Sequence, residues 1–279
     1  MKYFFTWLLF VATTGSAQTI LQFDKRFVES EDRWVAFQMD KDGSYQYGFI
    51  YIDAQAGLTF NYEGRFKITG QGVFVPEKID SFIMKSRLEP NQVKVAFIPE
   101  SKFNELKIDA VPEWLKFYKT DTASIERLYR WGFLYNSWDE CSKALTYLER
   151  AQKINPKFKG LEFELAFAYN ALQQYDKAIT VLQSALETSP ADCLLYKELS
   201  FAEMQSGQLN KAVETSKKGI DNCSNKQWKA EIAYNIAYQF YKAKDKVNFA
   251  LWANETKKWA TKGDRYSTNV TKMEENIDK

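Results

Sequence analysis

The side chains that could do chemistry in this sequence are limited by the absence of histidine from its 279 residues. Without imidazole, the chain cannot form Ser-His-Asp or Cys-His nucleophile pairs, and it lacks the commonest zinc ligand. Paired carboxylates could still hydrolyse glycosidic bonds. No spacing singles out such a pair, so the sequence predicts no catalytic residue, no metal site and no cofactor.

A short acidic stretch is similar to a calcium-binding loop. Asp40, Asp42 and Ser44 alternate within "DKDGSY". In a calcium loop, however, the glycine stands at another position, and a bidentate glutamate is required where this chain has Tyr51. We therefore predict a turn here.

The second half of the chain contains a repeated sequence pattern, which would determine where the side chains of a functional site lie. The segments "CSKALTYLERAQKINP" and "YDKAITVLQSALETSP" end at Pro156 and Pro190, which are 34 residues apart, and Ser224 stands at the next equivalent position. Proline ends a helix because it has no amide hydrogen to donate. A repeating period of this length predicts stacked supersecondary units that bury a shared core.

Small residues recur at two positions of each unit, where neighbouring helices could approach closely. The first position holds Ala144, Ala178 and Ala212, and the second holds Ala151, Ala185 and Gly219. Large-then-small pairs recur earlier in each unit, as Trp131-Gly132, Leu165-Ala166 and Leu199-Ser200. We therefore expect pairs of antiparallel helices in close contact.

This pattern resembles the tetratricopeptide repeat family over residues 125–226, with a diverged fourth unit extending to about residue 262. The resemblance implies a concave surface, lined by the first helix of each unit, that binds a protein or peptide. It places the following residues on that surface: Tyr129, Phe133, Asn136, Phe163, Phe167, Asn170, Lys197, Phe201 and Tyr238. Only Lys197 and the two asparagines suit a carboxylate ligand, so the aromatic column favours an apolar or extended peptide. Alternatively, these rings are covered by the N-terminal half or by a C-terminal helix.

The three cysteines all lie in the repeats and have no metal-ligand spacing. Cys193 and Cys223 stand at the beginning and end of one unit, whose antiparallel helices bring those ends together. Two interpretations are open, namely a disulfide in an oxidising compartment or two small buried residues.

Residues 18–110 read as strands rather than helices. A hairpin with Asp42-Gly43 in a tight turn divides its side chains between two faces. One face holds Val35, Phe37, Ile50 and Ile52, and the other holds Trp34, Tyr45, Tyr47, Phe49 and Tyr51. The aromatic face is interpreted as either core or a platform for sugars or a partner.

Three further strands are predicted in this half, over residues 58–69, 81–88 and 93–99. In the first of them Leu58, Phe60, Tyr62, Phe66 and Ile68 are expected on one face, with Gly64 as a candidate bulge. The result is an antiparallel sheet or sandwich.

The first residues read as a secretory signal peptide, because Lys2 precedes a short apolar run and Gly15 and Ala17 precede a cleavage site. The run is too short to span a bilayer. The chain carries 38 basic and 36 acidic residues, a balance that does not favour nucleic-acid binding. We therefore expect no nucleic-acid partner and no membrane span after cleavage.

The sequence thus predicts an α+β protein of two domains. The expected segments are a signal peptide (1–17), a β-rich domain (18–110), a linker helix (111–124), helical repeats (125–262) and a polar tail (263–279). The predicted function is a secreted or periplasmic scaffold that is not an enzyme. Two alternatives are open: a glycan-binding or carboxylate-dependent N-terminal module, and a structural part of an envelope complex.

Overall fold

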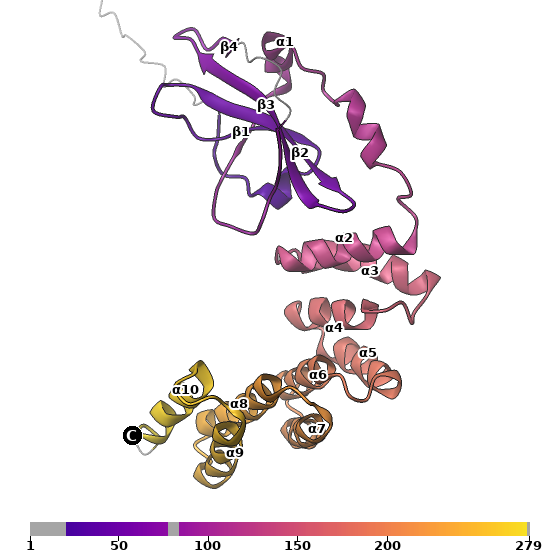
Figure 1. Ribbon diagram of the computed structural model, residues 1–279, viewed down its shortest axis with the longest axis vertical. Helices are drawn as coiled ribbons and strands as arrows, with labels where there is room; N and C mark the ends of the chain where they lie inside the picture. The colour runs from indigo at the N-terminus through magenta and orange to yellow at the C-terminus, as the bar shows by residue number, and fades with distance from the viewer. Residues whose placement is uncertain (1–20, 78–83, 278–279) are drawn as a thin grey trace, which may run out of the picture. The chain divides into compact units, whose positions relative to one another are not determined.

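The computed structural model describes residues 21–77 and 84–277 (Figure 1). It divides into two compact units, the first ending at Tyr118 and the second beginning at Lys119. The predicted α+β class with two domains is confirmed. The predicted signal peptide lies outside the described residues.

The first unit is an antiparallel sheet with short helical turns. Its strands are β1 (Arg33–Ala36), β2 (Tyr45–Asp53), β3 (Gly57–Ile68), β4 (Phe74–Glu77), β5 (Met84–Arg87) and β6 (Ala96–Phe97). They run in the order β4-β3-β2-β1-β6, and β5 also pairs with β3. The helical turns are η1 (Phe27–Ser30), η2 (Glu100–Lys102), α1 (Phe103–Leu106) and η3 (Glu113–Tyr118). The strands therefore form one sheet rather than a sandwich.

The β1–β2 hairpin has the predicted faces but a different turn. Gly43 has φ +81° and donates its amide hydrogen to the carbonyl oxygen of Asp40. Asp42 has no positive φ, because its carboxylate accepts hydrogen bonds from the amide and hydroxyl of Ser44, which fixes an ordinary turn ahead of the glycine. Arg65 lies 3.4 Å from Asp40 and 3.3 Å from Asp42, so a protein cation neutralises this acidic loop.

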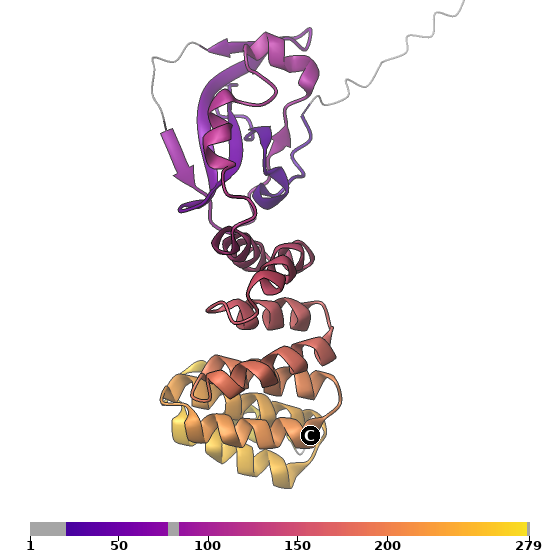
Figure 2. The ribbon, with the colours of Figure 1, turned by 90° about the vertical axis from the view of Figure 1, so that its right-hand side faces the viewer.

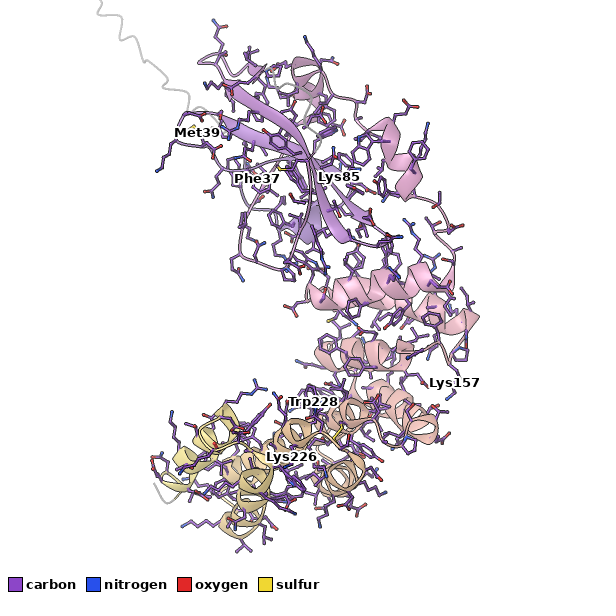
Figure 3. The ribbon with its side chains drawn as sticks, in the orientation of Figure 1. Phe37, Met39, Lys85, Lys157, Lys226 and Trp228 are labelled. Atoms are coloured by element: carbon purple, nitrogen blue, oxygen red, sulfur yellow. A yellow bond between two sulfur atoms is a disulfide. The ribbon has the colours of Figure 1, made fainter. Side chains whose placement is uncertain are left out.

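The aromatic face of the hairpin is core. Trp34, Tyr47, Phe49 and Tyr51 are each at most 5% exposed. η3 covers them, and the ring of Tyr51 lies 5.0 Å from that of Trp114. Lys85 of β5, labelled in Figure 3, donates a hydrogen bond to the hydroxyl of Tyr118 at the same place. The alternative of an open sugar platform on this face is therefore wrong.

The expectation that one face of residues 58–69 carries all their apolar side chains is also wrong. Tyr47 pairs with Gly64 and Gly48 pairs with Tyr62, so Glu63 is an extra residue in β3. Because side chains alternate along a strand, one extra residue switches the faces beyond it. Phe66 accordingly packs with Tyr47, whereas Phe60 packs on the opposite face against Phe37, with ring centroids 5.0 Å apart.

Helix η3 replaces the predicted linker helix over residues 111–124. Leu115 is buried in the sheet core, and Trp114 and Tyr118 pack against the same cluster. η3 therefore belongs to the first unit, which ends at Tyr118, because its apolar side chains complete the core of that unit.

The second unit consists of paired helices that follow one another in layers (Figure 2). The pairs are α2 (Ile125–Ser137) with α3 (Cys141–Ile154), α4 (Leu161–Ala171) with α5 (Tyr175–Thr188), α6 (Cys193–Gln205) with α7 (Leu209–Asn222), and α8 (Lys226–Lys242) with α9 (Lys246–Trp259). A further helix, α10 (Arg265–Glu274), follows. The predicted helical repeat is confirmed.

Local sequence explains both the turns and the close packing of these pairs. Asp139, Gln173 and Gly207 take a left-handed conformation 34 residues apart, which reverses the chain between the two helices of a pair. A Cβ atom added to Gly132 would lie 2.3 Å from the Leu148 side chain, and one added to Gly219 would lie 2.7 Å from Tyr196. The small residues therefore permit the helix contacts that the period predicts.

Within the predicted polar tail, residues Arg265–Glu274 form the helix α10, which packs on α8 and α9. Asp264 caps it by accepting from the amides of Tyr266 and Ser267. Val270 and Met273, together with Tyr266, are buried at helical spacing. Three apolar residues on one face are enough to anchor this mostly polar segment.

Candidate functional site

The first helix of each pair carries an aromatic ring that is exposed or half-buried at or near the same position of the repeat. Phe133 on α2 is 52% exposed, Phe201 on α6 is 36% exposed and Tyr238 on α8 is 41% exposed. Phe167 on α4 is half-buried. We call these four residues the ring ladder. α10 leaves the three exposed rings open.

A groove of about 540 Å³ lies between α4, α6 and α8, around two rings of the ladder. Its lining combines aromatic, amide and charged side chains. They are Phe167, Asn170, Ala171, Gln173, Tyr175, Lys197, Glu198, Phe201, Glu231 and Asn235. The groove could hold one segment of an extended ligand.

Of the residues predicted from the sequence, the groove gathers Phe167, Asn170, Lys197 and Phe201. The other five are not among its lining: Tyr129, Phe133, Asn136, Phe163 and Tyr238. Tyr129 packs against Phe158 with ring centroids 5.2 Å apart.

The two predicted asparagines are buried and form hydrogen bonds within the stack, and Asn170 also lines the groove. Asn136 and Asn170 are 3% and 5% exposed. The side-chain amide of Asn136 donates to both the main-chain oxygen and the carboxylate of Glu164, at 2.9 and 2.8 Å. Asn170 repeats this arrangement with Glu198, at 3.2 and 3.1 Å. Each asparagine therefore joins the first helices of two consecutive pairs through its side-chain amide.

A signal for these pairs was present in the sequence. Glu164 and Glu198 are carboxylates on mostly apolar helices, and they recur at the 34-residue period, as the asparagines do. Burial raises the pKa of Glu164, and the hydrogen bond from Asn136 opposes that rise. A buried charge that repeats with a buried amide predicts a structural contact between units.

Lys197 is already paired within the groove. Its ammonium lies 3.3 Å from the carboxylate of Glu198 and 3.8 Å from that of Glu231. The same ammonium lies 5.0 Å from the ring of Trp228, which is labelled in Figure 3. This lysine therefore has little charge to offer an anionic ligand.

Glu231 was not predicted as a groove residue from the sequence, because the fourth unit departs from the 34-residue spacing. Its second carboxylate oxygen accepts a hydrogen bond of 2.6 Å from the hydroxyl of Tyr266 on α10. Arg265 lies 3.5 Å from the same oxygen. Helix α10 thus fixes the side chain of Glu231 at the end of the groove.

A buried carboxyl on α6 gives a prediction of stability. Glu203 is 2% exposed and stands where Tyr135 and Tyr169 stand in the preceding units. Burial raises its pKa, and one of its oxygens has no hydrogen-bond partner among the described residues. Because the pKa of the Glu203 carboxyl is higher in the folded state than in the unfolded state, this group stabilises the fold fully at a pH below its unfolded pKa. That stabilisation is lost as the pH rises through the folded pKa.

We therefore expect Glu203→Gln to increase the free energy of unfolding at pH 7 by about 1 kcal/mol. The gain should shrink as the pH falls through the raised pKa of the folded protein and should be small below the ordinary glutamate pKa, because the wild-type carboxyl is then neutral too. Urea unfolding at pH 4 and pH 7 measures both values. Glu187→Gln, at an exposed position of α5, is the matched control and should change neither value. A gain that is independent of pH would contradict this explanation.

A disulfide joins Cys193, the first residue of α6, to Cys223, which follows α7. Their Cα atoms are 5.1 Å apart. Cys141 is a buried free thiol whose pKa is raised by burial. The covalent link ties together the two helices of the unit that contributes Lys197, Glu198 and Phe201 to the groove.

The part of the chain that the structure describes holds no cluster of three or more metal-binding side chains. Nor does any helix in residues 21–77 and 84–277 combine the length and hydrophobicity needed to cross a bilayer.

Residues 142–200 match the family model described as tetratricopeptide repeat. No curated protein matches the sequence.

Several solved structures are similar at low identity. MamA (41-end) from Desulfovibrio magneticus RS-1 is 20% identical, with a TM-score of 0.44, over 65% of this chain and 89% of its own. PilF from Pseudomonas aeruginosa is 15% identical, with a TM-score of 0.45, over 59% of this chain and 73% of its own. A tetratricopeptide repeat protein from Parabacteroides merdae ATCC 43184 is 16% identical, with a TM-score of 0.43, over 63% of each chain. These likenesses do not bear on what the chain binds.

Proposed function

We propose that this protein, whose helical unit carries tetratricopeptide repeats, binds a peptide segment of a partner protein in the groove between α4, α6 and α8. The observation that carries the proposal is the ring ladder, which places an aromatic side chain on the first helix of every pair. Desolvating large aromatic side chains contributes much of the binding energy at many protein interfaces.

The groove supports binding rather than catalysis. Glu198 holds Asn170 and Lys197, and Glu231 holds Lys197 and Tyr266. Carboxylates engaged in this way position other side chains and are poorly placed to transfer protons. The proposal therefore assigns this groove no reaction.

We also place the protein in a secreted or periplasmic compartment. The predicted signal peptide supports this placement, and so does the disulfide between Cys193 and Cys223, since such bonds persist in oxidising compartments. Fractionation of native cells, followed by mass analysis without reductant, should recover the cysteine pair oxidised and the chain starting at Gln18. Recovery of the full chain in a reduced cytosolic fraction would contradict the placement.

Site-specific photo-crosslinking in the native cell tests the binding surface. A photoreactive residue at Gln173 or Asn235 should capture the same protein, because both side chains line the groove. The control position is Val247, which is 74% exposed on α9 and is not among the lining residues. Adding Phe167→Ala and Phe201→Ala together should reduce capture about 100-fold, since two anchor side chains are lost. Equal capture from Val247, or capture that survives the double substitution, would overturn the proposal.

A further inference from the structure

The spacing of the ring ladder limits the conformation of a bound segment. α2 packs on α4, α4 on α6, and α6 on α8. Axes of helices in contact lie roughly 8–10 Å apart. Because Phe133, Phe167 and Phe201 occupy equivalent positions 34 residues apart on these helices, we infer that their rings recur at intervals of about 10 Å, with Tyr238 close to the next place on α8. A ligand that uses every ring must present matching side chains at that interval on a single face.

Among regular peptide conformations, polyproline II fits this interval. It has three residues per turn and a rise of about 3.1 Å per residue, so every third side chain faces the same way after about 9.3 Å. In a β-strand, side chains on one face recur after about 6.8 Å, and every third residue points to the opposite face. An α-helix repeats after about 5.4 Å, and although two turns span about 10.8 Å, its main-chain carbonyl oxygens are already hydrogen-bonded within the helix.

The polarity of the groove favours an uncharged ligand. Lys197 is flanked by Glu198 and Glu231, and the latter also accepts from Tyr266, so the charged side chains lining the groove have partners within the chain. An additional charge on the ligand would therefore be buried without a dedicated partner, at a cost in free energy.

Two amides of the groove suit a backbone that has no hydrogen bonds of its own. The side chains of Gln173 and Asn235 line the groove and make no hydrogen bond within the described residues. A polyproline II segment leaves its carbonyl oxygens free to accept from such amides. Proline has no amide hydrogen, so a bound proline segment needs no hydrogen-bond acceptor. The carboxylates of Glu198 and Glu231, which already have partners, are therefore not required to accept from it.

We propose that the groove recognises an uncharged, proline-rich segment in the polyproline II conformation, with one residue in three resting on a ring of the ladder. This inference rests on the proposed function and specifies its ligand. The preformed conformation lowers the entropy lost on binding, as in other aromatic-lined grooves that take such segments.

Calorimetric titration of the full chain with end-capped decaproline tests the proposal. Ten residues in this conformation span about 31 Å, enough to reach all four rings. We expect decaproline to bind at least 10-fold more tightly than a capped Gly-Ser peptide of equal length. Hexaproline should bind more weakly than decaproline, because it spans about 19 Å and reaches fewer rings.

Variants distinguish specific binding at the ring ladder from non-specific hydrophobic binding. Phe167→Ala and Phe201→Ala should each weaken decaproline binding about 10-fold or more. Phe117→Ala is the matched control, since this ring is 71% exposed but belongs to the sheet unit, and it should leave binding unchanged. Circular dichroism of each variant confirms that the helices are retained.

The failure of this inference can be told apart from failure of the proposed function. If decaproline binds no better than the Gly-Ser peptide, while crosslinking at Gln173 still captures a protein in a manner dependent on Phe167 and Phe201, the polyproline ligand is wrong and the binding surface stands. If neither decaproline nor the captured protein depends on those two rings, both proposals fall.

Discussion

Gly48→Ala is expected to lower the free energy of unfolding of the sheet unit by about 3 kcal/mol, the upper part of the range for overpacked cores. A Cβ atom at this position would lie 2.2 Å from the main-chain oxygen of Asn61 and 2.6 Å from the ring of Phe60. The ring could rotate away, but the main-chain oxygen belongs to the neighbouring strand and can move only if the pairing of β2 with β3 changes.

The location of Gly48 makes such a change costly. The register shifts between Tyr47 and Gly48, where Glu63 is the extra residue of β3. That shift directs Phe66 and Phe60 to opposite faces of the sheet, so a disturbed bulge would disturb the packing on both.

Differential scanning calorimetry of the full chain measures the effect. For a domain of about 100 residues, this loss corresponds to a decrease in Tm of roughly 15 °C. Gly70→Ala is the matched control, because nothing lies within 4 Å of its added Cβ atom. Equal melting temperatures for the two variants would show that the close approach at Gly48 has been misassigned.

Loss of the disulfide is expected to cost the helical unit about 3–4 kcal/mol. Cys193 and Cys223 are 30 residues apart in sequence, and opening a loop of this size returns considerable entropy to the unfolded chain. The Cys193→Ser, Cys223→Ser double variant should therefore unfold at lower denaturant concentration than the oxidised wild type.

Reductant supplies the internal control for this prediction. Dithiothreitol should lower the unfolding midpoint of the wild type towards that of the double variant and leave the double variant unchanged. Cys141→Ala should keep the sensitivity to reductant, because this cysteine is free. Two alkylatable thiols at Cys193 and Cys223 in untreated protein would contradict the bond.

The disulfide also bears on binding. α6 contributes Lys197 and Phe201 to the groove, and the bond holds α6 against α7 at the end where α6 begins. Measuring decaproline affinity with and without reductant would reveal how far this bond pre-organises the groove.

Sequence reasoning located the helical repeats well because their determinants are local and periodic. Pro156 and Pro190 mark helix ends 34 residues apart, and Ala144 and Ala178 mark contacts with the same spacing. It also divided the faces of the β1–β2 hairpin correctly, since side-chain alternation in a strand depends only on the chain itself.

Prediction from the sequence failed where the role of a residue depends on a partner that is distant in the chain. Asn136 looks like a surface residue of a groove until Glu164 lies beside it, and the pair is 28 residues apart. Glu63 looks like part of a regular strand until the pairing with β2 requires an extra residue there. Tyr266 looked like part of a polar tail, yet it packs on α8 and holds Glu231.

The repeat period, the helix ends, the hairpin faces and the recurrence of an aromatic residue on each first helix can all be predicted from the sequence alone. Each of these follows from local geometry or from a pattern that recurs along the chain. Only the tertiary structure decided that the asparagines are buried, that Lys197 is neutralised and that rings of the ladder stay exposed. Burial and charge pairing depend on which surfaces meet, and in this protein those surfaces bring together residues far apart in sequence, such as Asn136 with Glu164 and Lys197 with Glu231.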